Sequence, residues 1–534
     1  MKEIKELKIE ELTLEQKLGL SMIAFCWGEE ECDVDYLENL IKNHSLGGVW
    51  VCSRGEKNMP ILKRLKEAAD YPLLCFIDAE NGWGDYKVGR QNTIGMADSE
   101  EAAYAFGKVT AIGARADGYN IICSPVLDMV DIRVLCGGNI RALGSDKQKV
   151  AKLAAAIARG MHDGGVLTVG KHYPGKGKGK SSMSEIDSHM AETYSEATRE
   201  ELLDYALYPY MELDKEGLLD GVMLTHSRYI NVDEKYPASL SSELIKIFRE
   251  QGFSGFAMTD ALNMMGVVAK FGKKNSINLA VGNAGAIALP FHAKNFEVMK
   301  WLREGYDEGV ISPETLDSVV RSVLEAQHKV AVMQPKYNEI TKEDVEELEA
   351  INRNSVFAKC DDGVSVALDR EAEHFFAIMT ETELGIKDGD KVAVDTMKTN
   401  WYNPYHIGER LKELFPNSKV GYISEYPTPN RVSQFLSESL GHGDVVFITF
   451  INSAAYAGKE CLTPRIVSMV EAMQVSKRIS TLVHFGNPYV AEDFPHTERV
   501  LIGAASSMGV DAGLEVLAGE YPAKGVLTYD IKLR

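Results

Sequence analysis

The stretch GFAMTDALNMMG, residues 255–266, is a short apolar run followed by a carboxylate, Asp260. A second stretch, VLTVGKHY at residues 166–173, has the same form and ends around Lys171 and His172. Short apolar runs of this length are typical of buried strands. Five more runs of this kind occur in the first half of the chain: GGVWVCSR (47–54), PLLCFIDAE (72–80), NIICSPVLD (120–128), GVMLTHS (221–227) and AGAIALPFHA (284–293).

Segments with helical periodicity separate these runs. In EEAAYAFGKVTAIGARADG (100–118) and KVAKLAAAIARGMHDGG (149–165), apolar residues recur three or four positions apart. Strand followed by helix, repeated about seven times, predicts a parallel sheet. With so many units in roughly 300 residues, closure into a barrel is more economical than an open sheet. We therefore predict a (β/α)8 TIM-type barrel as the catalytic domain over residues 1–335.

The second half of the chain has its own strand series. A charged helical pattern predicts a linker helix over residues 336–354, and an open α/β (αβα) sandwich domain is expected over residues 355–534. Its expected strands are KVAVDTM (391–397), KVGYIS (419–424), DVVFITF (444–450), STLVHFG (480–486) and RVLIGAAS (499–506).

Polar side chains stand where the apolar runs of the barrel end. Function in such barrels lies on the C-terminal face, because the loops that follow the strands meet there. In addition, Asp187-Ser188-His189 places a carboxylate two residues from an imidazole, close enough to pair with it and raise its basicity. The strand-end candidates are Asp78, Asp128, Lys171, His172, His226 and Asp260.

Composition excludes several classes of protein. The 45% hydrophobic and 25% charged fractions are those of an ordinary globular protein. A formal net charge of −20 argues against nucleic acid or an anionic membrane as a partner, because both would be repelled. The charged start, MKEIKELKIEELTLEQKLG, and eight cysteines without a CxxC pair predict a cytoplasmic protein with reduced thiols and no zinc site.

The segment KHYPGKGKGKSSMSEIDSH, residues 171–189, reads as a long loop after a strand. Its lysines, Lys176, Lys178 and Lys180, fit either a solvated loop face or a site that attracts phosphate. The segment does not meet the Walker spacing, because only three residues separate Gly175 from Gly179. Nucleotide binding is therefore not expected, and the sequence predicts neither a cofactor nor a metal site.

Taken in order, six motifs resemble those of glycoside hydrolase family 3, in particular its bacterial β-N-acetylglucosaminidase branch in the two-domain form. The resemblance extends over nearly the whole chain, since HFGNPYVAEDFP (484–495) and LAGEYPAKGVL (517–527) are similar to the ending of the two-domain members. The six motifs are IDAENG at Asp78, SPVLD at Asp128, NIRALGSD at Arg141, KHYPGKG followed by DSH at His189, VMLTH at His226, and TDALNM at Asp260.

The resemblance implies a role for each matching residue. Asp260 corresponds to the nucleophile that forms a glycosyl-enzyme ester, His189 to the general acid/base and Asp187 to its partner. A histidine can donate and then accept the same proton, which suits that role. The residues expected to bind the sugar are Asp78, Arg141, Lys171, His172 and His226.

Three departures from the family pattern bear on the substrate. The second histidine of the family's PGHG is Lys176 here, and the loop that follows is longer and richer in lysine. The family's GGR is replaced by Asn81-Gly82-Trp83-Gly84, and AGxD by NAGA at residues 283–286. None of these changes removes the nucleophile or the acid/base.

The resulting hypothesis is a retaining, exo-acting β-N-acetylglucosaminidase that cleaves small carbohydrate substrates. Within the same class, β-glucosidase activity and phosphorolysis with phosphate as the acceptor stay open. A sugar-binding protein without turnover and a Schiff-base aldolase that uses Lys171 are the rivals from other classes. The sequence leaves the natural aglycone and the oligomeric state undetermined.

Overall fold

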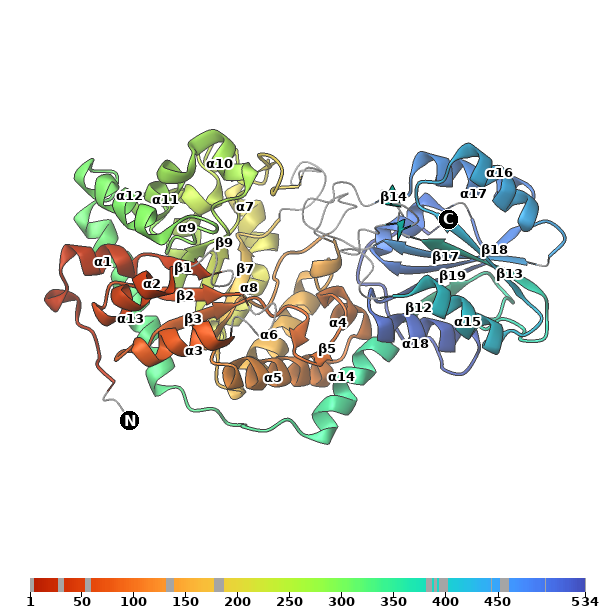
Figure 1. Cartoon of the computed structure of the whole chain (residues 1–534), viewed down its shortest axis with the longest axis horizontal. Helices are drawn as coiled ribbons and strands as arrows, with labels where there is room; N and C mark the ends of the chain where they lie inside the picture. The colour runs from red at the N-terminus through yellow and green to blue at the C-terminus, as the bar shows by residue number, and fades with distance from the viewer. Residues whose placement is uncertain are drawn as a thin grey trace. The chain divides into compact units, whose positions relative to one another are not determined.

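The computed structural model describes residues 4–26, 33–52, 59–130, 139–176, 187–380, 387–388, 391–392, 402–442, 444–451, 461–494 and 496–533. The chain forms two compact units, which are described separately (Figure 1). Of the lysines in the predicted loop, Lys176 is described, whereas Lys178 and Lys180 lie outside the described residues.

The first unit is built on a seven-stranded sheet in which every neighbouring pair is parallel. All of these strands are buried apart from His172, which is partly exposed, as expected where side chains fill both faces of a sheet. The strands are, in spatial order, β1 (Ile23–Cys26), β2 (Gly48–Val51), β3 (Leu74–Ile77), β6 (Ile121–Ile122), β7 (Leu167–Tyr173), β9 (Gly221–Leu224) and β11 (Phe256–Thr259).

An eighth segment closes this sheet. Ile287 forms a parallel bridge to Met258 in β11, and Ala288 forms one to Met22, next to β1. The Thr259 amide donates to Ile287 O at 3.0 Å, and the Ile23 amide donates to Ala288 O at 2.9 Å. The predicted barrel is thus confirmed, with AGAIALPFHA in the eighth position.

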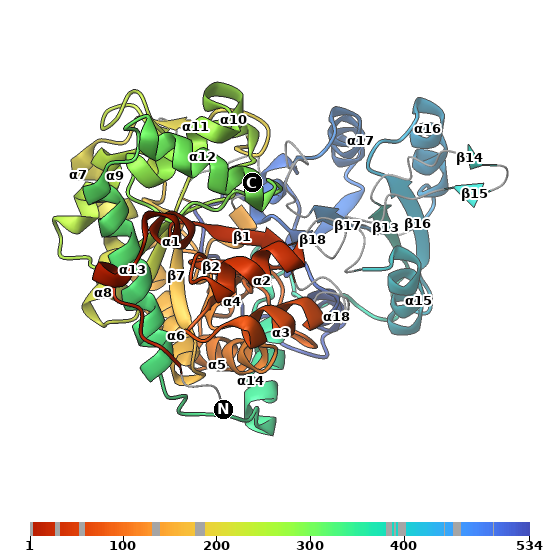
Figure 2. The ribbon, with the colours of Figure 1, turned by 60° about the vertical axis from the view of Figure 1, so that its left-hand side comes forward.

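Helices surround the strands of the barrel (Figure 2). Their ends carry capping side chains: for α13, the Ser312 hydroxyl accepts from the Thr315 amide, and Pro313 occupies the first turn. The longer helices of this unit are α1 (Leu14–Leu20), α2 (Val34–Lys42), α3 (Met59–Ala68), α5 (Glu100–Ala116), α6 (Lys147–Asp163), α8 (Tyr208–Lys215), α9 (Ser242–Arg249), α11 (Lys273–Gly282), α12 (Asn295–Asp307) and α13 (Pro313–Val332).

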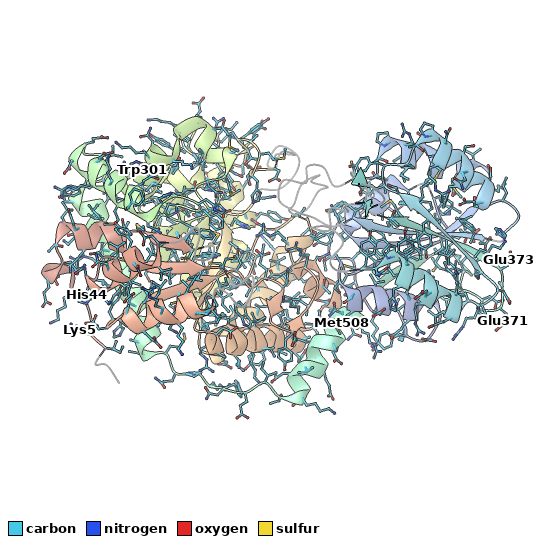
Figure 3. All side chains as sticks on the ribbon, in the orientation of Figure 1. Lys5, His44, Trp301, Glu371, Glu373 and Met508 are labelled. Atoms are coloured by element: carbon cyan, nitrogen blue, oxygen red, sulfur yellow. The ribbon has the colours of Figure 1, made fainter. Side chains whose placement is uncertain are left out.

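Ion pairs attach the first and the last segment of this unit to the rest of it. Asp70 accepts from Lys5 Nζ at 2.6 Å and pairs with His44 Nε2 at 2.7 Å, which fixes the N-terminal segment (Figure 3). At the other end, Lys108 Nζ lies 2.9 Å from Asp344 Oδ1, and both side chains are about one-tenth exposed. Asp344 lies in α14 (Lys342–Asn354), so this buried pair attaches the start of the linker helix to α5.

The second unit is the predicted αβα sandwich. Its six-stranded sheet is parallel except for β12, which runs antiparallel to β19. Helices α16 and α17 cover one face and α15 and α18 the other, and each pair packs on its own apolar cluster (Figure 1). The spatial order is β12 (Phe357–Cys360), β19 (Arg499–Gly503), β18 (Ile479–Gly486), β17 (Asp444–Ile451), β13 (His374–Thr380) and β16 (Lys419–Ser424); the helices are α15 (Pro404–Leu414), α16 (Pro429–Glu438), α17 (Pro464–Val475) and α18 (Ser507–Leu517).

One strand prediction in this unit is wrong. KVAVDTM was expected to enter the sheet, but Lys391–Val392 (β15) pairs with Lys387–Asp388 (β14) in a separate antiparallel ladder, and residues 393–397 lie outside the described residues. The sheet position belongs to β13 (His374–Thr380), which pairs with both β16 and β17. A run of β-branched residues identifies a strand, but only the pairing partners decide which sheet it enters.

The domain boundaries at residues 335 and 355 stay predictions. By contacts, the chain divides after Val345, and residues 88–102 and 130–146 group with the second unit. Two hydrogen bonds illustrate this grouping: the Val526 amide donates to Met96 O at 2.9 Å, and the Tyr529 hydroxyl donates to Ala142 O at 2.6 Å. Residues 88–102 and 130–146, which interrupt the barrel in the sequence, therefore belong to the same compact unit as the sandwich.

The prediction of reduced thiols throughout is wrong at Cys26, whose sulfur is in a disulfide. Five other cysteines carry free thiols, and Cys32 and Cys136 lie outside the described residues. Within the described part of the chain, no helix is both long and apolar enough to cross a membrane.

Candidate active site

Asp260 follows the last residue of β11, at the C-terminal end of the barrel. Its amide donates to Leu224 O at 3.0 Å, and its carboxylate accepts from the Ala261 amide at 2.7 Å. Burial alone would raise the pKa of Asp260, but the imidazoles of His172 and His226, together with the Ala261 amide, hold it below the usual value. This carboxylate is therefore ionised at neutral pH and fixed by the backbone.

His226 is fully buried and uses both ring nitrogens within the protein. Nε2 lies 2.9 Å from Ala261 O, and Nδ1 lies 2.8 Å from Ser239 Oγ. Burial lowers the pKa of His226, so the ring is neutral at pH 7. Since a carbonyl oxygen only accepts, Nε2 carries the proton and Nδ1 accepts from the Ser239 hydroxyl. His226 thereby holds the backbone next to Asp260.

Lys171 lies near the end of β7 with its side chain only 1% exposed. Its ammonium contacts two carboxylates from the segment after β3: Asp78 Oδ1 at 2.5 Å and Glu80 Oε1 at 2.6 Å. The two carboxylates differ in environment, because Asp78 is 53% exposed and Glu80 only 10%. Asp78 therefore has carboxylate surface free for a ligand, whereas Glu80 mainly neutralises the buried ammonium.

The Cys123 thiol is buried just beyond the end of β6. Burial raises the pKa of Cys123 well above its usual range, and the charges of Asp78, Lys171 and Asp260 also act on this thiol. Because every neighbouring pair of strands from β3 to β11 is parallel, these strands all end on the same face of the barrel.

His172, the residue after Lys171, pairs with a further strand-end carboxylate. Its Nδ1 donates to Asp128 Oδ2 at 2.7 Å, and both side chains are only about one-tenth exposed. Because a carboxylate orients the imidazole, the opposite ring nitrogen has a fixed direction. The imidazole also acts on the Asp260 carboxylate, as described above.

Asp187 and His189 form the pair expected from their spacing. His189 Nδ1 donates to Asp187 Oδ1 at 2.7 Å, and the same oxygen accepts from the His189 amide at 2.9 Å. The His189 side chain is 30% exposed, whereas that of Asp187 is only 10% exposed. This hydrogen bond fixes the orientation of the ring, and the imidazole of His189 also helps to lower the pKa of Asp260.

Helix α10 (Met265–Phe271) fixes the turn that carries this dyad. The Met265 amide donates to His189 O at 3.2 Å, and the Gly266 amide donates to Ser188 O at 3.0 Å. The nucleophile candidate and the acid/base candidate are thus joined through one short stretch of chain after β11. The arrangement combines an ionised carboxylate with an imidazole that can donate a proton.

Arg141 belongs to a short helical turn in the second unit and stays a prediction. Trp83 donates from Nε1 to Asp117 Oδ2 at 2.6 Å, so its indole packs toward α5. Sequence reasoning missed Glu80, although it stands in the quoted IDAENG, and Ser239, which lies shortly after the quoted GVMLTHS.

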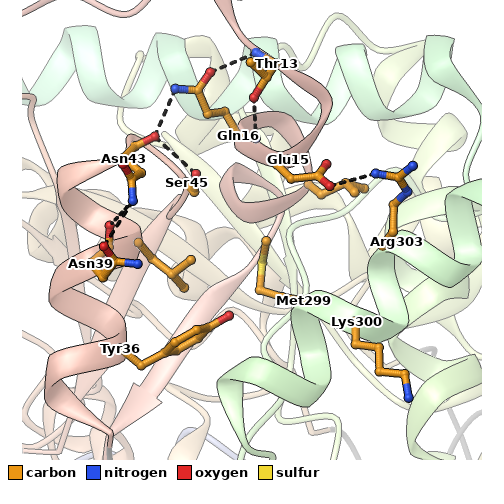
Figure 4. A pocket seen from close by; sticks show the side chains of 12 residues that line it. Thr13, Glu15, Gln16, Tyr36, Asn39, Asn43, Ser45, Met299, Lys300 and Arg303 are labelled. Carbon is orange, nitrogen blue, oxygen red and sulfur yellow. Dashed lines mark hydrogen bonds and ion pairs between the residues drawn. The ribbon is translucent and has the colours of Figure 1, made fainter.

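Within the described ranges, no group of three or more metal-binding side chains is arranged to hold an ion. A cavity of about 640 Å³ lies in the outer helical layer between α1, α2 and α12, where Arg303 pairs with Glu15 (Figure 4). None of its lining residues belongs to a strand, so it is separate from the strand ends described above.

Solved structures share the fold of this chain. A glycoside hydrolase family 3 β-N-acetylglucosaminidase from Paenibacillus sp. str. FPU-7 matches with a TM-score of 0.76 and 24% identity, over 98% of this chain and 100% of that chain. The β-glucoside phosphorylase BglX matches with a TM-score of 0.77 and 21% identity, over 98% of this chain and 94% of that chain.

Sequence comparisons identify the family. A β-hexosaminidase of Pseudomonas aeruginosa (strain LESB58) is 35% identical over 257 residues, which are 46% of this chain and 75% of that protein. A β-hexosaminidase of Tolumonas auensis is 29% identical over 272 residues, which are 48% of this chain and 78% of that protein. The model of the glycosyl hydrolase family 3 N-terminal domain matches residues 6–326. Because this match extends over more than half of the sequence, the chain belongs to glycoside hydrolase family 3.

Proposed function

We propose that this glycoside hydrolase is a retaining, exo-acting β-N-acetylglucosaminidase that acts on small β-linked amino-sugar glycosides. The support for the sugar is the naming of relatives as β-hexosaminidases, at up to 35% identity. The support for the mechanism is one observation: the Asp187–His189 pair is hydrogen-bonded to the helix that follows Asp260.

In the first step, Asp260 attacks the anomeric carbon of the sugar while the bond from this carbon to the leaving oxygen breaks. His189 gives its Nε2 proton to that oxygen, so the aglycone leaves as a neutral alcohol. Asp187 accepts the Nδ1 proton of the ring in a hydrogen bond of 2.7 Å and stabilises the imidazolium before the transfer. The product of this step is a glycosyl ester on Asp260.

In the second step, water attacks the anomeric carbon and the ester bond to Asp260 breaks. The neutral His189 now accepts a proton from this water, which restores the starting state of both residues. Two displacements at the same carbon retain its configuration. The low pKa of Asp260 suits both steps, because it favours attack as a carboxylate and departure as a carboxylate.

For the sugar subsite, we assign hydroxyl binding to Asp78 and His172 and a supporting role to Lys171. The half-exposed Asp78 carboxylate and the ring of His172 each have a partner that fixes their direction. His226 was predicted to contact the sugar, but both of its ring nitrogens are hydrogen-bonded within the protein. We therefore assign to it the positioning of the backbone next to Asp260. Arg141 stays a proposed sugar-binding residue on the family resemblance alone.

The test of the mechanism is His189→Ala on two substrates. The variant should lose roughly 10² to 10⁴ in rate on an alkyl N-acetylglucosaminide, which needs a proton on its leaving oxygen, and much less on a dinitrophenyl glycoside, which does not. With the second substrate, glycosyl-enzyme should accumulate and added azide should release it. Mass spectrometry should locate the sugar on Asp260.

His44→Ala is the matched control. His44 also pairs with an aspartate at 2.7 Å, but it lies at the N-terminal surface of the barrel unit. This variant should show no dependence on the leaving group. A sugar attached to any other residue, or equal losses of His189→Ala on both substrates, would reject the assignment. Turnover of aryl β-glucoside in preference to aryl N-acetylglucosaminide would make the enzyme a β-glucosidase, and no turnover of either would favour a sugar-binding protein.

Phosphorolysis is a second candidate, supported by the chemistry of the acid/base. A histidine does not repel phosphate as a carboxylate would, and Lys176 adds a positive charge to the loop after β7. Phosphate as the acceptor should raise turnover and give the sugar 1-phosphate. Water-only products at high phosphate would remove this candidate. The aldolase candidate fits poorly, because two carboxylates favour the ammonium form of Lys171, which cannot attack a carbonyl.

A further inference from the structure

Helix α10 starts at Met265, shortly after Asp260, and Met264 is its N-cap. The first amides of a helix have no partner inside it. Here the first two donate instead to the turn that holds the dyad: Met265 to His189 O at 3.2 Å and Gly266 to Ser188 O at 3.0 Å. The two hydrogen bonds hold two successive carbonyl groups of the turn, those of Ser188 and His189.

Gly266 lets the helix approach this turn closely. A Cβ added at position 266 would lie 2.7 Å from Ser188 O and 3.0 Å from Ala191 O. Both are backbone oxygens, so neither can move unless the turn itself moves. Glycine is therefore required here for the close approach of two backbone segments.

We infer that the first turn of α10 positions the acid/base, with Gly266 and the Met265 amide as the positioning groups. The inference rests on the proposed role of His189. Because the same stretch of chain begins at Asp260, the distance between the nucleophile and the acid is set by a short local segment. A shift of this turn moves the His189 ring while Asp260, held by Leu224 O and the Ala261 amide, stays in place.

Two variants perturb this contact in different ways. Gly266→Ala inserts a methyl group against the turn. Met265→Pro removes the amide that donates to His189 O, at the first helical position, which tolerates proline. The preceding residue, Met264, already has the extended backbone (ψ 139°) that a following proline requires.

Two further variants are the references. Met265→Ala removes the same exposed side chain as the proline variant and keeps the amide, so the comparison isolates the hydrogen bond. Ala269→Gly exchanges the same two residue types as Gly266→Ala, at an exposed position in the same helix. It measures the effect of a general change in helix stability on the two rates.

Both test variants should lose about 10- to 100-fold in kcat on the alkyl glycoside, a part of what general acid catalysis supplies, with KM little changed. On the dinitrophenyl glycoside their rates should stay close to the rate of the corresponding reference. This second rate also reports that the barrel is folded and Asp260 is active. If Gly266→Ala does not fold, Met265→Pro decides alone.

The outcomes separate the inference from the function on which it rests. If His189→Ala depends on the leaving group but neither test variant does, the inference is wrong and the function stands. If the test variants lose the same factor on both substrates, the contact is merely structural and the inference is also wrong. If the loss in rate of His189→Ala does not depend on the leaving group, His189 is not the general acid. The inference and the proposed mechanism are then both wrong.

Discussion

Glu80→Gln and Asp78→Asn should have opposite consequences, although both carboxylates contact the same ammonium. Lys171 Nζ lies 2.5 Å from Asp78 Oδ1 and 2.6 Å from Glu80 Oε1, and the lysine side chain is 1% exposed. Each substitution keeps an oxygen that accepts from the ammonium and removes one negative charge. The distances are nearly equal, so the difference between the two sites comes from exposure: 53% for Asp78 and 10% for Glu80.

The expected cost for Glu80→Gln follows from the change in hydrogen-bond type. A hydrogen bond to a charged group contributes roughly 1.5–3 kcal/mol and a neutral one about 0.5–1.5, so the substitution should destabilise the barrel by about 1–2 kcal/mol. For Asp78→Asn, solvent screens the lost charge and the cost should stay below about 1 kcal/mol. In activity the order reverses, because only Asp78 has surface for a sugar hydroxyl: kcat/KM should fall about 10- to 100-fold.

Thermal unfolding and steady-state kinetics on an aryl N-acetylglucosaminide measure both effects. At roughly 2–4 °C per kcal/mol, the unfolding midpoint of the barrel should drop by about 2–8 °C in Glu80→Gln, with kcat/KM within a factor of about 10 of the parent. The reasoning is refuted if Asp78→Asn is the less stable variant, or if Glu80→Gln loses the larger factor in kcat/KM.

Two further predictions concern pH. The acid limb of the pH profile of kcat/KM should report the ionisation of Asp260 and lie below the usual pKa of an aspartate. Because His172 lowers the pKa of Asp260, this limb should move to higher pH in His172→Gln. A limb that does not move would contradict the role of His172 in lowering that pKa. Since burial lowers the pKa of His226, the unfolded state takes up its proton first as pH falls, so the stability that His226 adds is present above about pH 6.5 and lost below it. The gap in unfolding midpoint between the parent and His226→Gln should therefore narrow from pH 8 to pH 5.5, and a constant gap would mean that the ring is not buried as a neutral group.

Much of the fold could be predicted because most strands of the barrel have a local signal, a short apolar run with a polar residue at its end. Six of the seven apolar runs contain strands of the sheet, and the seventh supplies the closing segment at Ile287 and Ala288. The strand β1 was missed, since SMIAFC follows a charged helix without a polar residue of interest at its end. In the sandwich, β13 was missed and KVAVDTM was misplaced, because sheet membership depends on partners far away in the sequence.

For the candidate site, more of the residues could be predicted from the sequence than of the contacts between them. Asp187 and His189 pair as expected, because two positions of separation allow a hydrogen bond within one turn. Two contacts could not be predicted from spacing in this way. They are the hydrogen bond of Ser239 to His226 and the ion pair of Glu80 with Lys171. Both contacts join segments that the sequence keeps apart, and neither serine nor glutamate at those positions has a pattern of its own.

The Lys171 contact shows what additional rule would have found it. Lys171 and Asp78 are 93 positions apart, and β6 lies between their strands in the sheet. The parallel register places the ends of β3, β6 and β7 on one face of the barrel, and β6 is followed by the small Cys123 and Ser124. A long side chain can cross such a strand end, whereas a bulky residue there would block it. The ion pair could therefore be predicted from three features of the sequence: a lysine near the end of β7, small residues after β6, and carboxylates after β3. The same three features place Glu80 as well as Asp78 in the site.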